Sequence, residues 1–210
     1  MCSSWVAHYA GNAGESRKGA KQLSSRWNMA DSNITKNALA TSLKKLMREK
    51  PFEKISVSDI CNDCGMNRKS FYYHFKDKYD LVNWIFYVGC IGKLNFSAYE
   101  RGWDVMYDIC KSFYADKEFY STAFQIDGQN SLKEYALETF EPITRYFLQG
   151  STVIGDDEEF FVTFFGDAFL SAIMRWVKEG MSLTPEQFME KIHKLSLGLA
   201  EKVIEDENIN

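Results

Sequence analysis

The sequence predicts an all-α fold, and three observations support this. Apolar residues recur at intervals of three and four along most of the chain, the spacing that places them on one face of a helix. Residues that cap helices stand in front of these segments. The 210 residues include only three prolines and thirteen glycines, and no segment has the alternating pattern of a half-buried strand.

Residues 1–28 differ from the rest of the chain and are expected to lie outside the fold. The stretch 10–25 is rich in small and basic residues and has no apolar periodicity. The helical pattern begins close to Met29. We therefore interpret 1–28 as a disordered arm or as an extension upstream of the folded chain.

The first folded part contains four predicted helices. They cover residues 32–50, 57–64, 68–75 and 78–93. Pro51 stops the first helix, because proline cannot continue the helical hydrogen-bond pattern. Ser56, Asn67 and Asp77 are N-caps of the other three. Gly65 closes the second helix, since glycine tolerates the left-handed backbone that commonly ends one.

The rest of the chain contains five more predicted helices. They cover residues 102–115, 117–125, 131–149, 157–179 and 185–205. Ser131 and Glu134 have the spacing of a capping box, and Thr184-Pro185 is a typical helix start. The stretch 160–177 is apolar on nearly every side, so this helix is expected to be covered all round.

The most specific pattern lies between residues 55 and 78, where two short helices flank a tight turn at Gly65 and Met66. This arrangement predicts a helix-turn-helix, whose second helix enters the major groove of DNA. Phe71 and Phe75 are four residues apart and are expected to point inward. The residues left to face the groove or its walls are Arg68, Lys69, Ser70, Tyr72 and Tyr73.

This stretch resembles the DNA-binding head of the tetracycline-repressor (TetR) family over about residues 32–82. The motif positions are occupied by Ser56, Val57, Ile60, Gly65, Met66, Asn67, Phe71, Tyr72, His74, Phe75 and Lys78. The resemblance implies phosphate contacts from Ser56, Tyr72, His74 and Lys78. It implies base reading by Arg68, Lys69, Ser70 and Tyr73.

The resemblance also implies the organisation of the whole chain. Residues 29–80 form the helix-turn-helix DNA-binding domain, and 81–210 form a helical regulatory and dimerisation domain. In a nine-helix TetR-like fold, the last two helices pair with those of a second subunit. The implied function is that of a transcriptional regulator that binds a pseudo-palindromic operator on double-stranded DNA as a homodimer.

Two readings of its regulation remain open. Segments 119–135 and 165–180 resemble the branch of the family that includes activators of dihydroxyacetone kinase operons, which implies control by a protein co-activator. Alternatively, a small-molecule effector binds in the body. Six aromatic residues are candidates either for lining such a pocket or for ordinary core packing: Phe113, Tyr114, Phe119, Tyr120, Phe124 and Trp176.

The charge distribution agrees with a DNA-binding head. Residues 1–80 carry fourteen Lys and Arg against eight Asp and Glu, whereas residues 81–210 carry eleven against twenty-one. A basic segment attached to an acidic body suits a polyanionic partner.

Other functional classes find little support. Five cysteines are an odd number and do not form a disulfide framework, which suits a reducing cytoplasm. Cys61 and Cys64 have the spacing of half a zinc site, but no second pair follows, so we interpret them as small buried residues. We find no catalytic constellation and expect no enzyme activity, cofactor or metal. No run of eighteen apolar residues occurs, so we expect no membrane span.

Overall fold

The structure is a computed structural model that describes residues 33–99, 102–128, 130–148 and 157–207. Within these ranges the regular elements are nine α-helices and three short 3-10 helices, with no strand. The predicted all-α fold is therefore confirmed. The predicted arm at 1–28 lies outside the described residues.

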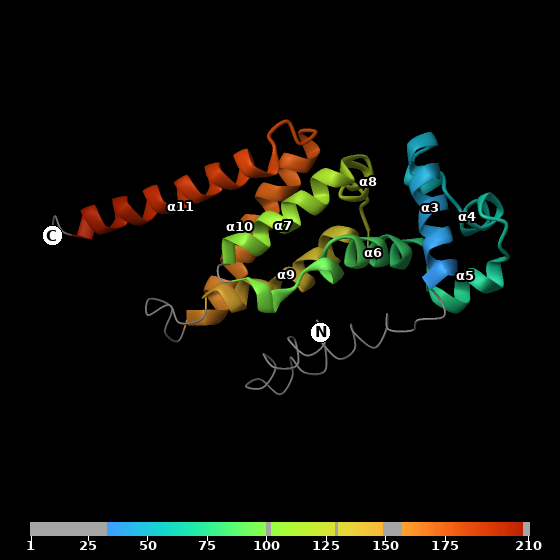
Figure 1. Ribbon diagram of the computed structural model, residues 1–210, viewed down its shortest axis with the longest axis horizontal. Coiled ribbons are helices and arrows are strands. Elements are labelled where there is room, and N and C mark those ends of the chain that lie inside the picture. The colour runs from blue at the N-terminus through green and yellow to red at the C-terminus, as the bar shows by residue number, and fades with distance from the viewer. Residues whose placement is uncertain (1–32, 100–101, 129, 149–156, 208–210) are drawn as a thin grey trace.

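The first helices form a small head around a shared apolar centre. They are α3 (Asn33–Glu49), the 3-10 turn η2 (Phe52–Lys54), α4 (Val57–Asp63) and α5 (Arg68–His74). Leu39, Leu43, Ile60 and Phe71 are fully buried between them. The Ser42 hydroxyl donates to the Ile60 carbonyl at 2.9 Å, which fixes α3 against α4. Figure 1 shows these helices together at one end of the molecule.

Helix α6 (Lys78–Gly89) leads from the head into the body (Figure 1) and is shorter than the predicted 78–93. The chain turns at Cys90 into the 3-10 helix η3 (Ile91–Lys93). At Gly89 a Cβ atom would lie 3.1 Å from the Tyr120 hydroxyl, so the body approaches closely where α6 ends. The predicted domain boundary after residue 80 falls inside α6, which is continuous across it.

The body is built from the remaining helices. They are α7 (Gly102–Ala115), α8 (Lys117–Ala123), α9 (Leu132–Leu148), α10 (Glu158–Lys178) and α11 (Pro185–Glu207), preceded by the 3-10 helix η4 (Phe96–Ala98). Of the six aromatic residues left open by the sequence, five are buried and Tyr114 is partly exposed. The Phe113 ring lies 4.7 Å from that of Tyr120 and 5.5 Å from that of Phe124. Most of this group is therefore core.

Helix α10 does not meet the expectation that it is covered on every side. Its buried face carries Val162, Leu170, Ile173, Trp176 and Val177. On the other side, Phe160 is 66% exposed, Phe164 56% and Phe165 47%. Large apolar side chains clustered at the surface indicate an interaction face. Within one chain, nothing described covers these three rings.

Within the described residues, α10 is the one helix whose length and composition would allow it to cross a membrane. The same test is passed by core helices of soluble proteins. Asp167 and Arg175 interrupt its apolar sequence, which is why the sequence contains no run of eighteen apolar residues.

Candidate nucleic-acid interface

The turn between α4 and α5 is fixed by backbone geometry at Gly65. Gly65 has φ +68°, the left-handed region that side chains other than glycine disfavour. The amide of Met66 then donates to the Cys61 carbonyl at 2.8 Å, which closes the end of α4. The chain leaves this turn in the direction that places α5 across α4.

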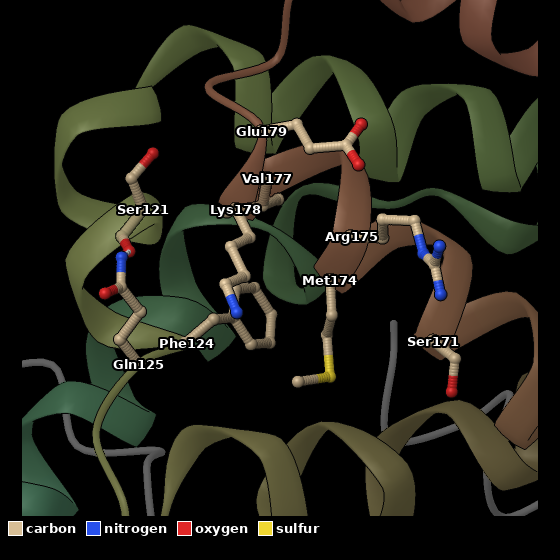
Figure 2. Close-up of a pocket in the computed structure, with 9 residues that line it drawn as sticks. All are labelled: Ser121, Phe124, Gln125, Ser171, Met174, Arg175, Val177, Lys178 and Glu179. Atoms are coloured by element: carbon tan, nitrogen blue, oxygen red, sulfur yellow. Dashed lines mark hydrogen bonds between the residues drawn. The ribbon is translucent and has the colours of Figure 1, made fainter.

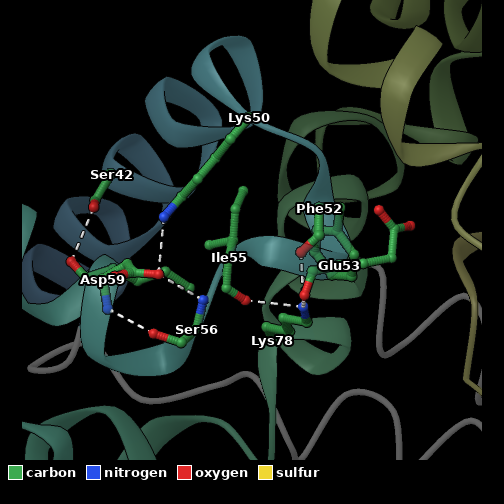
Figure 3. Close-up of polar contacts among 9 residues, drawn as sticks. Ser42, Lys50, Phe52, Glu53, Ile55, Ser56, Asp59 and Lys78 are labelled. Atoms are coloured by element: carbon green, nitrogen blue, oxygen red, sulfur yellow. Dashed lines mark hydrogen bonds and ion pairs between the residues drawn. The ribbon is translucent and has the colours of Figure 1, made fainter.

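The N-terminus of α4 is held by a capping box (Figure 3). The Asp59 amide donates to the Ser56 hydroxyl at 3.1 Å, and the Ser56 amide donates to the Asp59 carboxylate at 2.9 Å. Lys50 at the end of α3 also donates to Asp59, at 2.9 Å. The Ser56 amide and then the Lys50 ammonium lower the pKa of Asp59 to about 2. Ser56 itself is exposed beside this N-terminus.

Helix α5 is anchored by its apolar side and presents its polar side to solvent. Phe71 and Phe75 are buried, as the sequence predicted. Asn67 caps the helix, because its side-chain oxygen accepts from the Ser70 amide at 2.8 Å. The same oxygen accepts from the Ser70 hydroxyl at 3.2 Å, so Ser70 is half-buried and already bonded.

Four of the predicted DNA-facing residues lie exposed on α5: Arg68, Lys69, Tyr72 and Tyr73. Tyr73 is 81% exposed and Tyr72 is 50% exposed, values that a core tyrosine does not reach. The Arg68 guanidinium donates to the Tyr72 hydroxyl at 3.4 Å, one helical turn away. The structure therefore places two cationic side chains and two phenol groups together on the exposed surface of α5.

His74 lies at the C-terminal end of α5 and is half-buried. Its ring contacts that of Tyr73, with the centroids 4.9 Å apart. Burial and the nearby charge of Lys36 on α3 lower the pKa of His74. The imidazole is accordingly neutral at neutral pH and can donate one hydrogen bond.

Lys78, for which the resemblance implies a phosphate contact, has its ammonium bonded inside the unbound chain. Its ammonium donates to three backbone carbonyls at the end of the η2 turn: Phe52 at 2.7 Å, Ile55 at 2.9 Å and Glu53 at 3.3 Å (Figure 3). Desolvation at this place lowers the pKa of Lys78. All three of its N–H donors are used inside the chain, so in this structure Lys78 joins α6 to the head.

Sequence reasoning missed the contacts that join the head to the body. Lys44 on α3 forms an ion pair with Asp116, and Arg48 pairs with Glu118 at 2.8 Å. The Lys44 ammonium also lies 4.9 Å from the centre of the Phe119 ring. These partners are about seventy residues apart in the chain, so no local motif marks them.

Comparison with known proteins assigns this architecture. A family model described as "Bacterial regulatory proteins, tetR family" matches residues 41–85, which contain α4, the turn and α5. A second, described as "Transcriptional regulator C-terminal region" of the TetR type, matches residues 103–198. The chain belongs to the TetR family.

One curated relative is the HTH-type dhaKLM operon transcriptional activator DhaS of Lactococcus lactis. Our chain and DhaS are 31% identical over 101 residues, which make up 48% of our chain and 54% of DhaS. The match therefore spans about half of the length of DhaS.

Two solved structures share the fold. The dihydroxyacetone kinase operon activator DhaS superposes with a TM-score of 0.60 at 21% identity, over 79% of this chain and 96% of that one. The second structure is NalD, described as the secondary repressor of the MexAB-OprM multidrug efflux pump in Pseudomonas aeruginosa. It superposes with a TM-score of 0.55 at 16% sequence identity, over 78% of this chain and 94% of NalD. At these identities the likeness concerns the fold alone.

The TetR assignment confirms the class inferred from the sequence. The protein is a DNA-binding transcriptional regulator of a non-enzymatic family, and α4 with α5 is its helix-turn-helix. Cys61 is buried, and the half-buried Cys64 donates to the Ile60 carbonyl at 3.2 Å, as expected of packing residues. Within the described ranges no three His, Cys, Asp or Glu side chains gather as metal ligands.

Proposed function

We propose that this regulator binds a pseudo-palindromic operator as a homodimer in the cytoplasm, with α5 of each subunit in the major groove. The observation that supports this most directly is the open polar side of α5 opposite the buried rings of Phe71 and Phe75. A two-fold dimer presents two such helices to two half-sites related by the same symmetry.

The proposal divides the exposed residues by chemistry. Arg68 and Lys69 donate to guanine edges, and Ser70 and Tyr73 contact bases beside them. Ser56, Tyr72 and His74 bind phosphate oxygens and set the position of the head. Lys78 can contact phosphate only if its ammonium leaves the three carbonyls to which it now donates. We therefore assign it the role of positioning the head relative to α6.

Dimerisation is assigned to α11 and to the N-terminal half of α10. Phe160, Phe164 and Phe165 form an exposed aromatic cluster on α10, and Leu195 and Leu197 are exposed on α11. Pairing these helices with those of a second subunit would remove the rings from water.

We propose that an effector bound in the C-terminal body modulates DNA affinity. The second candidate is an activator of a dihydroxyacetone kinase-type operon controlled by a protein co-activator, and the similarity to DhaS favours it. A thermal-shift screen against metabolites separates the two, since a ligand that binds the native fold raises the melting temperature. A broad metabolite panel without any shift would favour the co-activator.

The test of the main proposal is selection of bound sequences from a random duplex DNA pool. We expect enrichment of a palindrome, and Arg68→Ala should degrade one position in each half of it. Control selections use Lys133→Ala, which removes an exposed cation from α9. Binding without enrichment, which vanishes at moderate salt, would contradict sequence-specific recognition by this chain alone.

A further inference from the structure

A pocket of about 540 Å³ lies between the end of α8 and the C-terminal half of α10 (Figure 2). This volume is in the range of sites that hold small molecules. Phe124, Met174 and Val177 supply apolar lining, and Ser121, Gln125 and Ser171 supply polar groups. Phe124 belongs both to this lining and to the aromatic core, so the pocket opens at the edge of that core.

The charged residues of the pocket are Arg175, Lys178 and Glu179. Figure 2 shows the Lys178 and Arg175 side chains on either side of Met174, with Glu179 beyond them at the end of the helix. No ion pair within the described part of the chain involves Arg175 or Lys178. Residues 81–210 carry eleven basic against twenty-one acidic side chains, so acidic partners are plentiful in the body. Arg175 and Lys178 outnumber Glu179, so the charged lining is net positive, and two cations that form no ion pair among the described residues, beside apolar side chains, favour an anionic ligand.

Helix α8 connects this pocket to the DNA-binding head. Its C-terminal end supplies Ser121, and the turn that follows it supplies Phe124 and Gln125. At its N-terminal end, Asp116 and Glu118 form the ion pairs with Lys44 and Arg48 of α3. Because α8 is only seven residues long, a shift of the helix caused at one end is expected to move the other end as well.

We propose that the pocket between α8 and α10 binds a small organic oxyanion, a carboxylate or phosphate on an apolar group. The ion pairs of α8 with α3 then transmit its occupancy to the head. This deepens the proposed function and rests on it, since it names the chemistry of the effector and its route to DNA. Arg175 and Lys178 bind the oxyanion, while Phe124 and Met174 contact the apolar part. A ligand in the pocket changes operator affinity only if the position of α8 differs between the ligand-bound and the ligand-free protein.

The binding step is tested with two matched pairs of probes, benzoate with benzamide and phenyl phosphate with phenol. Ligand-observed NMR on the full chain should detect a charged member and not its neutral partner. Lys178→Gln and Arg175→Gln should each weaken that binding about tenfold, as expected for loss of a charge-assisted hydrogen bond. Lys133→Gln, an exposed cation of α9, should leave it unchanged. Equal binding of charged and neutral probes, or no binding of either anion at millimolar concentration, would overturn the site.

The transmission step is tested without any ligand. Ser121→Phe fills the pocket from α8, and it should change operator affinity by about fivefold or more, the range of typical allosteric coupling. The same substitution should have less than about a twofold effect in a chain that also carries Asp116→Asn and Glu118→Gln. Gln125→Phe, at the exposed rim, is a second filling variant, and melting curves show that each variant is folded.

Equal effects in both backgrounds would overturn the route through α8. A change of oligomeric state in Lys178→Gln, measured by sedimentation, would instead assign the pocket to the subunit interface and overturn the ligand site. Failure of the unmodified chain to bind any operator would contradict the proposed function itself. The probe-binding experiment does not depend on that result.

Discussion

Lys78 donates to the Phe52 carbonyl at 2.7 Å, and its ammonium lies 4.3 Å from the centre of the Phe52 ring. The first residue of α6 thus closes the turn that precedes α4, and it joins the helix that leads into the body to the DNA-binding head. The predicted phosphate contact would need donors of this ammonium. Here the backbone of residues 52–55 occupies them.

Lys78→Met should therefore lower the free energy of unfolding by about 1–3 kcal/mol, the cost of losing hydrogen bonds from a charged donor. Urea denaturation followed by circular dichroism measures the change. Lys54→Met, at an exposed lysine of the same turn, should stay close to wild type. Unaltered stability, combined with a salt dependence of DNA binding reduced by about one unit, would show that Lys78 contacts phosphate after all.

Arg68→Ala should relax the preference for one base position by about 1–3 kcal/mol and leave other positions unchanged. Its stability should change by less than about 0.5 kcal/mol, because the contact with Tyr72 is exposed to solvent. Competition binding with single-position operator variants measures the preference. A uniform loss across all variants would mean that Arg68 binds the backbone of DNA rather than a base.

Asp59 predicts an acid-dependent loss of stability. Its pKa falls from 3.8 to about 2 in the folded chain, so its contribution is fully present above about pH 4 and disappears as the pH falls through 2. Asp59→Asn should flatten the pH dependence of unfolding in that window. A curve for the variant that runs parallel to wild type between pH 4 and 2 would assign the acid sensitivity to other carboxylates.

His74 predicts that DNA binding strengthens as the pH falls from about 8 to 6. The lowered pKa leaves the imidazole neutral in the unbound chain, where it faces Lys36 of α3 and the rings of Tyr73 and Phe75. A phosphate beside it would favour protonation, so binding would take up a proton. Operator affinity measured across this pH range should lose most of its slope in His74→Gln. A slope that survives in this variant would exclude His74 as a phosphate ligand.

The helix-turn-helix could be predicted from sequence because each of its boundaries has a local signal. Ser56 and Asn67 cap their helices through atoms three residues away, and Gly65 has the positive φ that ends α4. The four-residue spacing of Phe71 and Phe75 determines which side of α5 is buried. These are short-range effects, and the exposed residues of α5 follow from them.

The role of Lys78 and the join between head and body could not be predicted in this way. Lys78 meets carbonyls that are more than twenty residues earlier, and Lys44 meets Asp116 across 72 residues. The close approach of Gly89, at the end of α6, to Tyr120 likewise involves another helix. Such contacts arise from tertiary packing, and a pattern of neighbouring residues does not encode them.

The aromatic cluster on α10 predicts a dimer that a single charge disrupts. Phe164→Glu places a carboxylate among Phe160 and Phe165, and burying it without a partner against a second subunit would be strongly unfavourable. Sedimentation at micromolar concentration should show a dimer for wild type and a monomer for this variant. Ile34→Glu, at an exposed apolar residue of α3, is the matched control and should remain dimeric. Because two linked heads bind a palindrome far more tightly than one, the monomer should lose about a hundredfold in operator affinity. A monomeric wild-type chain would instead require DNA or another protein to bring the two heads together.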